Sequence, residues 1–241
     1  RFATSVLKQY RRQCTDGEVG RLEEKNGAVI FVPDKNGDVE IWQHPRDNEY
    51  YCIGADVAEG LITGDYSVAY VGDNDFNVCM RYRTHIDPDL FGKEIVKIAK
   101  YYNDAYVGCE NNNHGLTTLK AIQNEDYWNI FFTKTYDKIA DTISQKVGWS
   151  TNNRTKPLMI NKLAEYIRNK WLGIKDRILI QECFTYVIDD KGATNAQEGC
   201  HDDTVMALAI LLQVLLEGKG ENYVPVDPEP GKAPRRKYYK A

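Results

Sequence analysis

Several absences narrow the class of this protein. No apolar run reaches the roughly 18 to 20 residues that a membrane-spanning helix needs, and the longest candidate, residues 205–216, is too short. No two cysteines stand at CxxC spacing, and the four histidines are scattered along the sequence. A zinc site is therefore not expected. The sequence also lacks a Gly-x-x-x-x-Gly-Lys-Ser/Thr phosphate loop, so we do not expect the chain to hydrolyse ATP on its own.

An excess of basic residues is missing too. The formal net charge is −4, which argues mildly against a nucleic-acid binder. A metal-dependent nuclease is a partial exception, because its acidic site holds the metal and its basic residues need only line a groove. The 241 residues are 42% hydrophobic and 27% charged, which is typical of a soluble globular protein with one large domain.

The two ends of the chain and its cysteines indicate whether it is part of a longer protein and in which compartment it works. The start, Arg1-Phe2-Ala3-Thr4, has neither the apolar core of a signal peptide nor an initiator Met. We expect a piece of a longer protein, and a processed N-terminus would look the same. Cys52, Cys79 and Cys109 lie in apolar runs, which predicts buried, reduced thiols in a cytoplasmic protein. Residues 218–241 are rich in Pro, Gly and charge, and we expect them to form a flexible tail that is either disordered or a docking peptide.

Acidic residues stand where apolar segments begin or end. Asp56 ends the run 50–55, Glu110 ends the run 105–109, and Asp202 and Asp203 open a long apolar helix. A carboxylate at the end of a buried strand must be solvated, paired or bound to a cation. Three such elements predict a cation pocket at one edge of a sheet, and oxygen ligands favour Mg²⁺ or Mn²⁺. This combination is typical of two-metal phosphodiester hydrolysis.

Each acid also has a simpler structural interpretation. Asp56 and Glu110 could cap loops or helices, and the macrodipole of a helix favours an acid at its N-terminus by about 0.3 to 1 kcal/mol. Adjacent helical residues point about 100° apart, so at most one of Asp202 and Asp203 should aim straight into the pocket. Asp65, at the start of the next strand, is a secondary candidate for the same edge, or a plain turn residue.

Hydrophobic periodicity predicts an α/β fold. Residues 50–56, 67–71 and 76–83 are rich in β-formers and closely spaced, which predicts a three-strand antiparallel meander. Helices and strands then alternate, which favours parallel pairing. The predicted helices are 87–102, 115–123, 155–170 and 202–217, and the predicted strands are 106–110 and 129–133. Residues 178–188 have a mixed pattern without a clear assignment.

The first 49 residues are predicted to be an entry segment. Residues 5–13 have the pattern of a short helix. Residues 28–33 and 39–42 read as two strands around the turn-rich stretch 34–38, which predicts a hairpin that packs on the main body.

Cations near the acids would be needed at a DNA backbone. Arg154 and Lys156 precede or open a helix, where backbone amides also bind phosphate. Lys191 lies beside Gly192 at an expected loop or hairpin tip. A solvated loop is the alternative interpretation of Arg154 and Lys156, and Lys191 is a weaker candidate than either.

These residues resemble a known family. The strings 54–60, 64–67, 110–115, 148–157 and 199–208 are similar, in the same order, to motifs of the nuclease domain of the large terminase subunit of tailed bacteriophages. The resemblance covers about residues 50 to 217. It implies an RNase H-like (retroviral integrase-like) mixed sheet flanked by helices, with residues 1–49 leading from an ATPase domain, residues 50–217 forming the nuclease and residues 218–241 forming the tail.

The resemblance also implies an activity and partners. It implies a two-metal endonuclease that cuts concatemeric viral DNA during genome packaging, in the cytoplasm of the bacterial host. Expected partners are double-stranded DNA and, in the full subunit, the portal protein, the small terminase subunit and the ATPase domain. We expect no membrane contact and a monomeric isolated domain.

The hypothesis for the site assigns a role to each acid. Asp56 would bridge two Mg²⁺ or Mn²⁺ ions roughly 3.5 to 4 Å apart. Glu110 would bind one ion, Asp202 or Asp203 the other, and Asp65 could help through water. Little sequence preference is expected, because no segment resembles a base-reading helix. A junction resolvase or transposase of the same fold, or a non-catalytic module that binds DNA or a capsid portal, are the alternatives.

Overall fold

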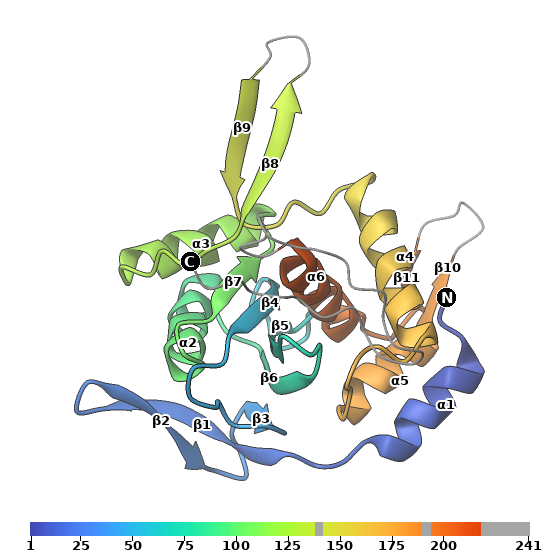
Figure 1. The fold of residues 1–241 in the computed structure, drawn as a ribbon, viewed down its shortest axis with the longest axis horizontal. Helices are drawn as coiled ribbons and strands as arrows, with labels where there is room; N and C mark the ends of the chain where they lie inside the picture. Colours follow the sequence, from blue (N-terminus) through green and yellow to red (C-terminus); the bar gives the residue numbers. More distant parts are fainter. Residues whose placement is uncertain (138–141, 189–193, 218–241) are drawn as a thin grey trace.

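A mixed sheet of seven strands forms the centre of the molecule in the computed structural model, which describes residues 1–137, 142–188 and 194–217 (Figure 1). The strand order is β2-β1-β3-β6-β5-β4-β7. The strands are β1 (Glu18–Lys25), β2 (Ala28–Pro33), β3 (Val39–Ile41), β4 (Tyr51–Asp56), β5 (Ser67–Asp73), β6 (Val78–Thr84) and β7 (Tyr106–Cys109). The β4-β5-β6 meander is antiparallel and β7 lies parallel to β4, which confirms the predicted fold class.

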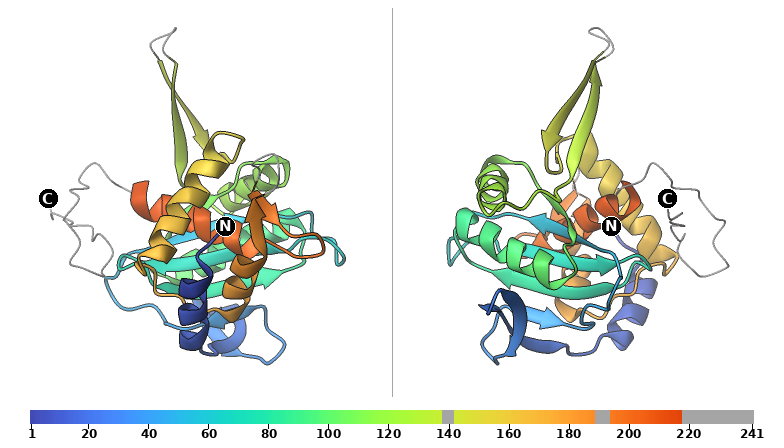
Figure 2. Two further views of the ribbon diagram at one scale, coloured as in Figure 1. Left: turned by 90° about the vertical axis from the view of Figure 1, so that its right-hand side faces the viewer. Right: turned by 60° about the vertical axis from the view of Figure 1, so that its left-hand side comes forward.

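Helices cover both faces of this sheet (Figures 1 and 2). One face packs against α2 (Pro88–Tyr101) and α3 (Asn113–Asn124), and the other against α4 (Thr155–Arg168), α5 (Arg177–Thr185) and α6 (Asp203–Glu217). Each of the predicted helices is present within a few residues of its expected bounds; the N-terminal one is α1 (Thr4–Gln13). The unassigned run 178–188 divides into α5 and a short strand, β10 (Tyr186–Ile188), which pairs with β11 (Thr194–Ala196). None of the helices described is long and apolar enough to cross a lipid bilayer.

Two glycines bring α6 directly onto the sheet. A Cβ at Gly54 would overlap the backbone of Leu211, and a Cβ at Gly108 would overlap the side chain of Val214. Gly54 of β4 and Gly108 of β7 are partners in the parallel register, so they form one flat patch under the helix. The chain therefore places α6 across the two strands that carry acids at their ends.

The N-terminal hairpin differs from the one predicted. β2 and β3 do not pair with each other; both pair with β1, a strand that the sequence analysis did not identify. Its sequence, EVGRLEEK, is mostly charged, and the actual turn is Asn26-Gly27, whose positive φ angles of 53° and 78° suit a two-residue hairpin. Because β3 also pairs with β6, the sheet continues across the boundary expected near residue 50.

Buried charges attach this N-terminal part to the rest of the molecule. Arg81 of β6 donates to Asp176 Oδ1 (2.6 Å) and to Glu40 Oε2 (2.7 Å). The Tyr70 hydroxyl donates to the other oxygen of Asp176 (2.5 Å). Asp176 also caps α5 by accepting from the Ile178 amide. Breaking one partner of such a network would leave an uncompensated buried charge.

A second hairpin corrects the prediction for residues 129–133. Ile130 makes a single parallel bridge to Val107 of β7, but the strand itself, β8 (Phe132–Asp137), leaves the central sheet and pairs antiparallel with β9 (Thr142–Val147). The β8–β9 hairpin projects far beyond the rest of the fold (Figure 2). Lys191 and the tail 218–241 lie outside the residues that the structure describes.

Candidate metal centre

Asp56 and Glu110 meet because β4 and β7 are parallel neighbours. Ala55 pairs with Cys109, and the Glu110 amide donates to the Ala55 carbonyl (3.0 Å), so the next residue of each strand lies at the same sheet edge. Side chains alternate along a strand, so Asp56 lies on the same face as Gly54, and Glu110 on the same face as Gly108. That face is the one under α6. Asp56 is half-buried and Glu110 is 7% exposed.

An asparagine orients the Glu110 carboxylate. Asn112 donates from Nδ2 to Glu110 Oε2 (2.7 Å), while its own Oδ1 accepts from the Gly115 amide (2.8 Å) and caps α3. Gly115 is required here because a Cβ would overlap the Glu110 carbonyl oxygen. The Asn-rich loop after β7 therefore serves both as a helix cap and as a support for the acid.

The two acids at the start of α6, Asp202 and Asp203, lie next to different residues. Asp203 is 4% exposed, and its Oδ2 accepts from the Tyr66 amide (3.0 Å), just before β5. Asp202 is half-buried, and its Oδ2 lies 4.0 Å from Lys156 Nζ at the start of α4. The geometry thus favours Asp203 as the acid that faces the loop carrying Asp65, with Asp202 balanced by a lysine.

His201 joins this group, although the sequence analysis did not select it. Its Nδ1 lies 3.3 Å from Asp65 Oδ1 and 3.5 Å from Asp203 Oδ2. Asp65, His201 and Asp203 each offer one ligand atom, and these atoms all lie within 4.8 Å of one another. The only sequence signal was the position of His201 directly before the acid pair, which was outweighed by the scatter of the four histidines.

Burial makes the carboxyl groups of Asp56, Asp202 and Asp203 hard to ionise. Burial raises the pKa of Asp56 well above its ordinary value, and the neighbouring Glu110, Asp203 and Asp202 raise it further. Burial also raises the pKa of Asp203 to about 7, with Glu182 and Asp65 adding to the rise and the Tyr66 amide and His201 opposing it. The pKa of Asp202 is raised by burial and lowered by Lys156. A divalent cation would reverse this balance, because it favours the ionised carboxylates.

The donor set fits a hard divalent cation. It consists of carboxylate oxygens and one imidazole nitrogen, with no thiolate among them. The exposed Cys200 is adjacent in sequence but is not a member of the group, and the other five cysteines are buried and form no disulfide among the described residues.

Comparison with known proteins supports the fold assignment. No family model matches the sequence. The magnesium-bound large terminase nuclease of thermophilic phage G20c superposes with a TM-score of 0.59 at 18% identity, over 86% of this chain and 96% of that one. The fold is that of the large terminase nucleases. The large terminase nuclease domain of Thermus phage P74-26 matches with a TM-score of 0.55 at 18% identity, over 87% of this chain and 94% of that one. The G20c nuclease has also been solved with bound cobalt, and that structure matches equally well, with a TM-score of 0.59.

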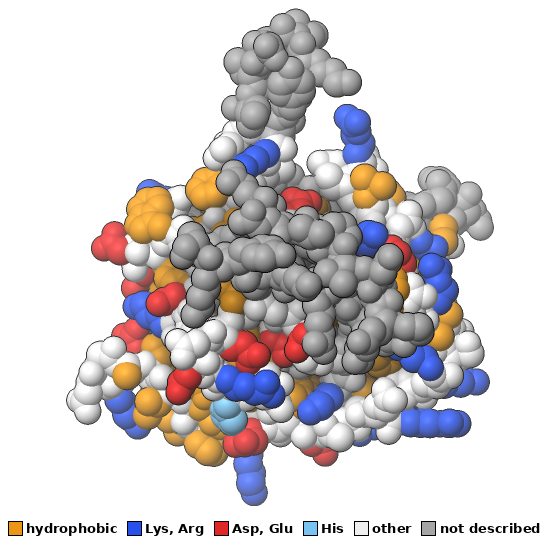
Figure 3. Space-filling model, in the orientation of Figure 1, with side chains coloured by type: hydrophobic (Ala, Val, Ile, Leu, Met, Phe, Trp, Pro, Cys, Tyr) orange, Lys and Arg blue, Asp and Glu red, His pale blue; other side chains and the backbone are white. Residues whose placement is uncertain are grey.

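Within this terminase-nuclease fold, the expected DNA-contacting cations have different positions. Lys156 lies beside the candidate metal centre, donating to Asn195 Oδ1 (3.0 Å) and approaching Asp202 Oδ2 to 4.0 Å. Arg154 is exposed in the turn before α4. On the face shown in Figure 3, both basic and acidic side chains are visible among the described residues.

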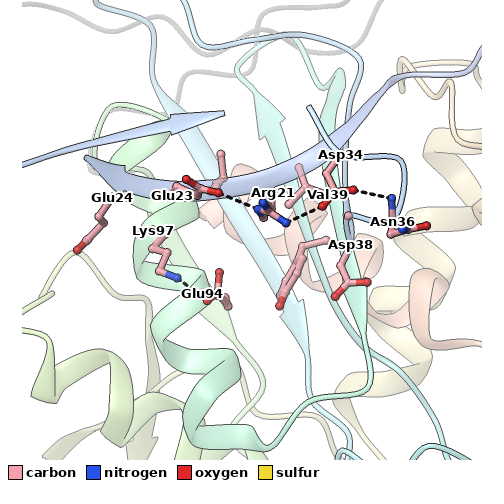
Figure 4. Close-up of a pocket in the computed structure, with 12 residues that line it drawn as sticks. Arg21, Glu23, Glu24, Asp34, Asn36, Asp38, Val39, Glu94 and Lys97 are labelled. Atoms are coloured by element: carbon pink, nitrogen blue, oxygen red, sulfur yellow. Dashed lines mark hydrogen bonds and ion pairs between the residues drawn. The ribbon is translucent and has the colours of Figure 1, made fainter. Parts of the chain in front are cut away.

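A groove on the other side of the terminase-nuclease fold is separate from this centre. It has a volume of about 630 Å³ and lies between β1, β3 and α2 (Figure 4). Five of its charged side chains are paired with one another: Arg21 contacts Glu23 and Asp34, and Lys97 contacts Glu94. None of its lining residues belongs to the acidic centre.

Proposed function

We propose that this chain is a metal-dependent endonuclease that cuts double-stranded viral DNA during genome packaging, as the nuclease part of a large terminase subunit. The observation that carries the proposal is the meeting of Asp56 and Glu110 at the ends of two parallel strands beside Asp203 at the start of α6. The shared fold with terminase nucleases, one of them solved with bound magnesium, supports the same conclusion.

The residues that would hold the metal follow from the geometry. Asp56 interacts electrostatically with both Glu110 and Asp203, so it is the proposed shared ligand of two Mg²⁺ or Mn²⁺ ions. Glu110 would complete one site, and Asp203, with Asp65 and His201, the other. When bound, such ions polarise the phosphate and generate a hydroxide nucleophile near neutral pH.

The other side chains orient these ligands or neutralise their charge. Asn112 holds Glu110 and the Tyr66 amide holds Asp203, so both carboxylates have defined directions before substrate arrives. Lys156 offsets the charge of Asp202 and stands where a DNA phosphate would approach. Arg154 and Lys191 are further candidates for backbone contacts, and such contacts carry little sequence preference.

The remaining expectations concern the other domains and proteins that would take part in DNA packaging. Energy for DNA movement would come from an ATPase domain elsewhere in the same subunit, since this sequence has no phosphate loop. The portal protein and the small terminase subunit are the proposed protein partners, the host cytoplasm is the proposed location, and the isolated domain is proposed to be a monomer.

A plasmid assay tests the proposal directly. Supercoiled plasmid is incubated with the chain and Mn²⁺ or Mg²⁺, beside Asp56→Ala, a control variant Asp47→Ala in an exposed loop, and a sample with EDTA. We expect nicking and linearisation by the unchanged chain and by Asp47→Ala, and none by Asp56→Ala or with EDTA. DNA that stays intact with every metal, or cutting that survives Asp56→Ala, would contradict the proposed function.

A further inference from the structure

The helix α5 supplies a buried carboxylate to the start of α6. Glu182 is 6% exposed, and its Oε2 accepts from both the amide (2.9 Å) and the hydroxyl of Thr204. Thr204 directly follows Asp203 in the first turn of α6. The first amides of a helix have no partner within it, so an acceptor from another element both satisfies the helix and sets its position.

From this contact we propose that Glu182 is a positioning residue for Asp203, which it holds through Thr204 in the direction that metal binding requires. The inference rests on the proposed metal-dependent function. Glu182 itself is not a member of the Asp65–His201–Asp203 group, so it acts through its neighbour and not as a ligand.

Asp203 is held from another side by Tyr66, whose amide donates to its carboxylate. The Tyr66 ring is itself fixed by contacts with β6 and the residue that follows this strand. The Arg83 guanidinium lies 3.2 Å from the centre of the ring, and the His85 ring centre lies 3.7 Å away. Asp203 is therefore anchored to the sheet through Tyr66 and to α5 through the bond between Thr204 and Glu182.

Placing Glu182 in the interior costs free energy, because part of its carboxylate is buried without a hydrogen-bond partner in the described part of the chain. A purely structural role does not explain this cost. The second oxygen of Glu182, Oε1, is buried and has no hydrogen-bond partner among the described residues. Burial raises the pKa of Glu182, opposed by its two bonds from Thr204. Because both bonds end on one oxygen, the variant Glu182→Gln could keep them with its amide oxygen and place its NH₂ group at the unpartnered position.

This leads to a test with matched variants of the whole 241-residue chain. Mn²⁺ affinity is measured by titration calorimetry without DNA, for Glu182→Ala, Glu182→Gln, Asp203→Asn and Ile95→Ala. Ile95 is a fully buried residue of α2 on the opposite face of the sheet, so its truncation controls for lost stability. We expect Glu182→Ala to weaken Mn²⁺ binding by about 10-fold or more, as is typical for residues that orient a ligand. Glu182→Gln and Ile95→Ala should bind like the unchanged chain, and Asp203→Asn should show the loss caused by removing a ligand.

The outcomes separate this inference from the function on which it rests. Unchanged affinity in Glu182→Ala, an equal loss in Ile95→Ala, or a loss in Glu182→Gln as large as in Glu182→Ala would each overturn the positioning role. An unchanged chain that binds no Mn²⁺ would overturn the metal-dependent function itself, and the positioning role with it. Plasmid cutting at increasing Mn²⁺ provides a second measurement, in which Glu182→Ala should need more metal and recover most of its rate at saturation.

Discussion

At the scale of single residues, the centre consists of acids that are costly to place so close together. Glu110 and Asp203 are almost fully buried, and both raise the pKa of Asp56. Two of the acids have neutral hydrogen-bond donors: Asn112 for Glu110 and the Tyr66 amide for Asp203. Neutral donors hold a carboxylate in place without cancelling its charge, so the attraction for a cation is retained.

Asn112 allows the orienting bond to be separated from helix capping. In Asn112→Asp, the cap of α3 should survive, because Asp caps helices as well as Asn does. The donor to Glu110 is lost and replaced by a second negative charge. We expect plasmid cutting to fall by about 10-fold or more. The urea midpoint should fall as well, because the new carboxylate repels the buried carboxylate of Glu110.

Asn112→Ala is the control for that variant. It removes both the cap and the donor, so it should also cost about 1 kcal/mol of stability. Equal cutting by Asn112→Asp and the unchanged chain would show that Glu110 needs no orienting donor.

At the scale of secondary-structure elements, strands β4 and β7 each carry a glycine two residues before the acid at the strand end, and this spacing explains how α6 and the acids come together. Gly54 precedes Asp56 by two positions, and Gly108 precedes Glu110 by two positions. Alternation along a strand puts each glycine and its acid on one face. The glycines let α6 lie against the backbone, and the acids then face the region where α6 begins. One pattern thus serves packing and the candidate site together.

Gly54→Ala should therefore destabilise the protein strongly. The added methyl group would overlap the Leu211 backbone, which cannot rotate away as a side chain could. We expect a loss of about 1 to 3 kcal/mol or more in urea unfolding. Gly64→Ala is the matched control, since its Cβ would lie 3.4 Å from the nearest atom, the Leu61 carbonyl oxygen. Similar urea midpoints for the two variants would show that α6 can shift away from the sheet.

One strand, β1, was missed, and the strand expected at 129–133 was misplaced, in both cases because strand pairing depends on tertiary contacts. Six of the eight residues of β1 are not buried, and most of them are charged. Its sequence therefore has few of the apolar and β-branched residues that indicate a strand. The residues around 129–133 carry one apolar run, but only tertiary contacts decide that Ile130 touches β7 while Phe132 starts a separate hairpin. Hydrophobic patterns indicate that a segment is extended and do not name its partner.

At the scale of the whole molecule, metal binding should be coupled to folding and to pH. Bound Mn²⁺ stabilises the folded chain, by about 2.7 kcal/mol when its concentration is 100 times the dissociation constant. The pKa of Asp203 is about 7, so below pH 7 a proton must leave before a cation binds. The affinity for Mn²⁺ should therefore rise as pH increases from about 6 to about 8, and the rise in melting temperature caused by Mn²⁺ should grow with it.

Melting curves with and without Mn²⁺ at pH 6, 7 and 8 check this expectation. Asp203→Asn is the control, because its side chain carries no titrating proton, and its response to Mn²⁺ should be small at each pH. A stabilisation by Mn²⁺ that is the same at pH 6 and pH 8 would count against Asp203 as a ligand.

The sequence by itself determined the fold class and the main acidic positions. Apolar runs that end in Asp56 and Glu110, and an apolar helix that opens with Asp202 and Asp203, are local patterns, and burial of a run makes its terminal acid conspicuous. The predicted meander and the parallel strand that follows it were confirmed for the same reason, since period and spacing are local properties.

Only the tertiary structure decided which groups surround those acids. His201 meets Asp65 across 136 positions of sequence, and Glu182 reaches Thr204 from a neighbouring helix. The tertiary structure also shows that Asp202 and Asp203 have different neighbours. The direction of each side chain depends on how α6 lies over Gly54 and Gly108. Contacts between distant segments are set by packing, which no local pattern of residues encodes.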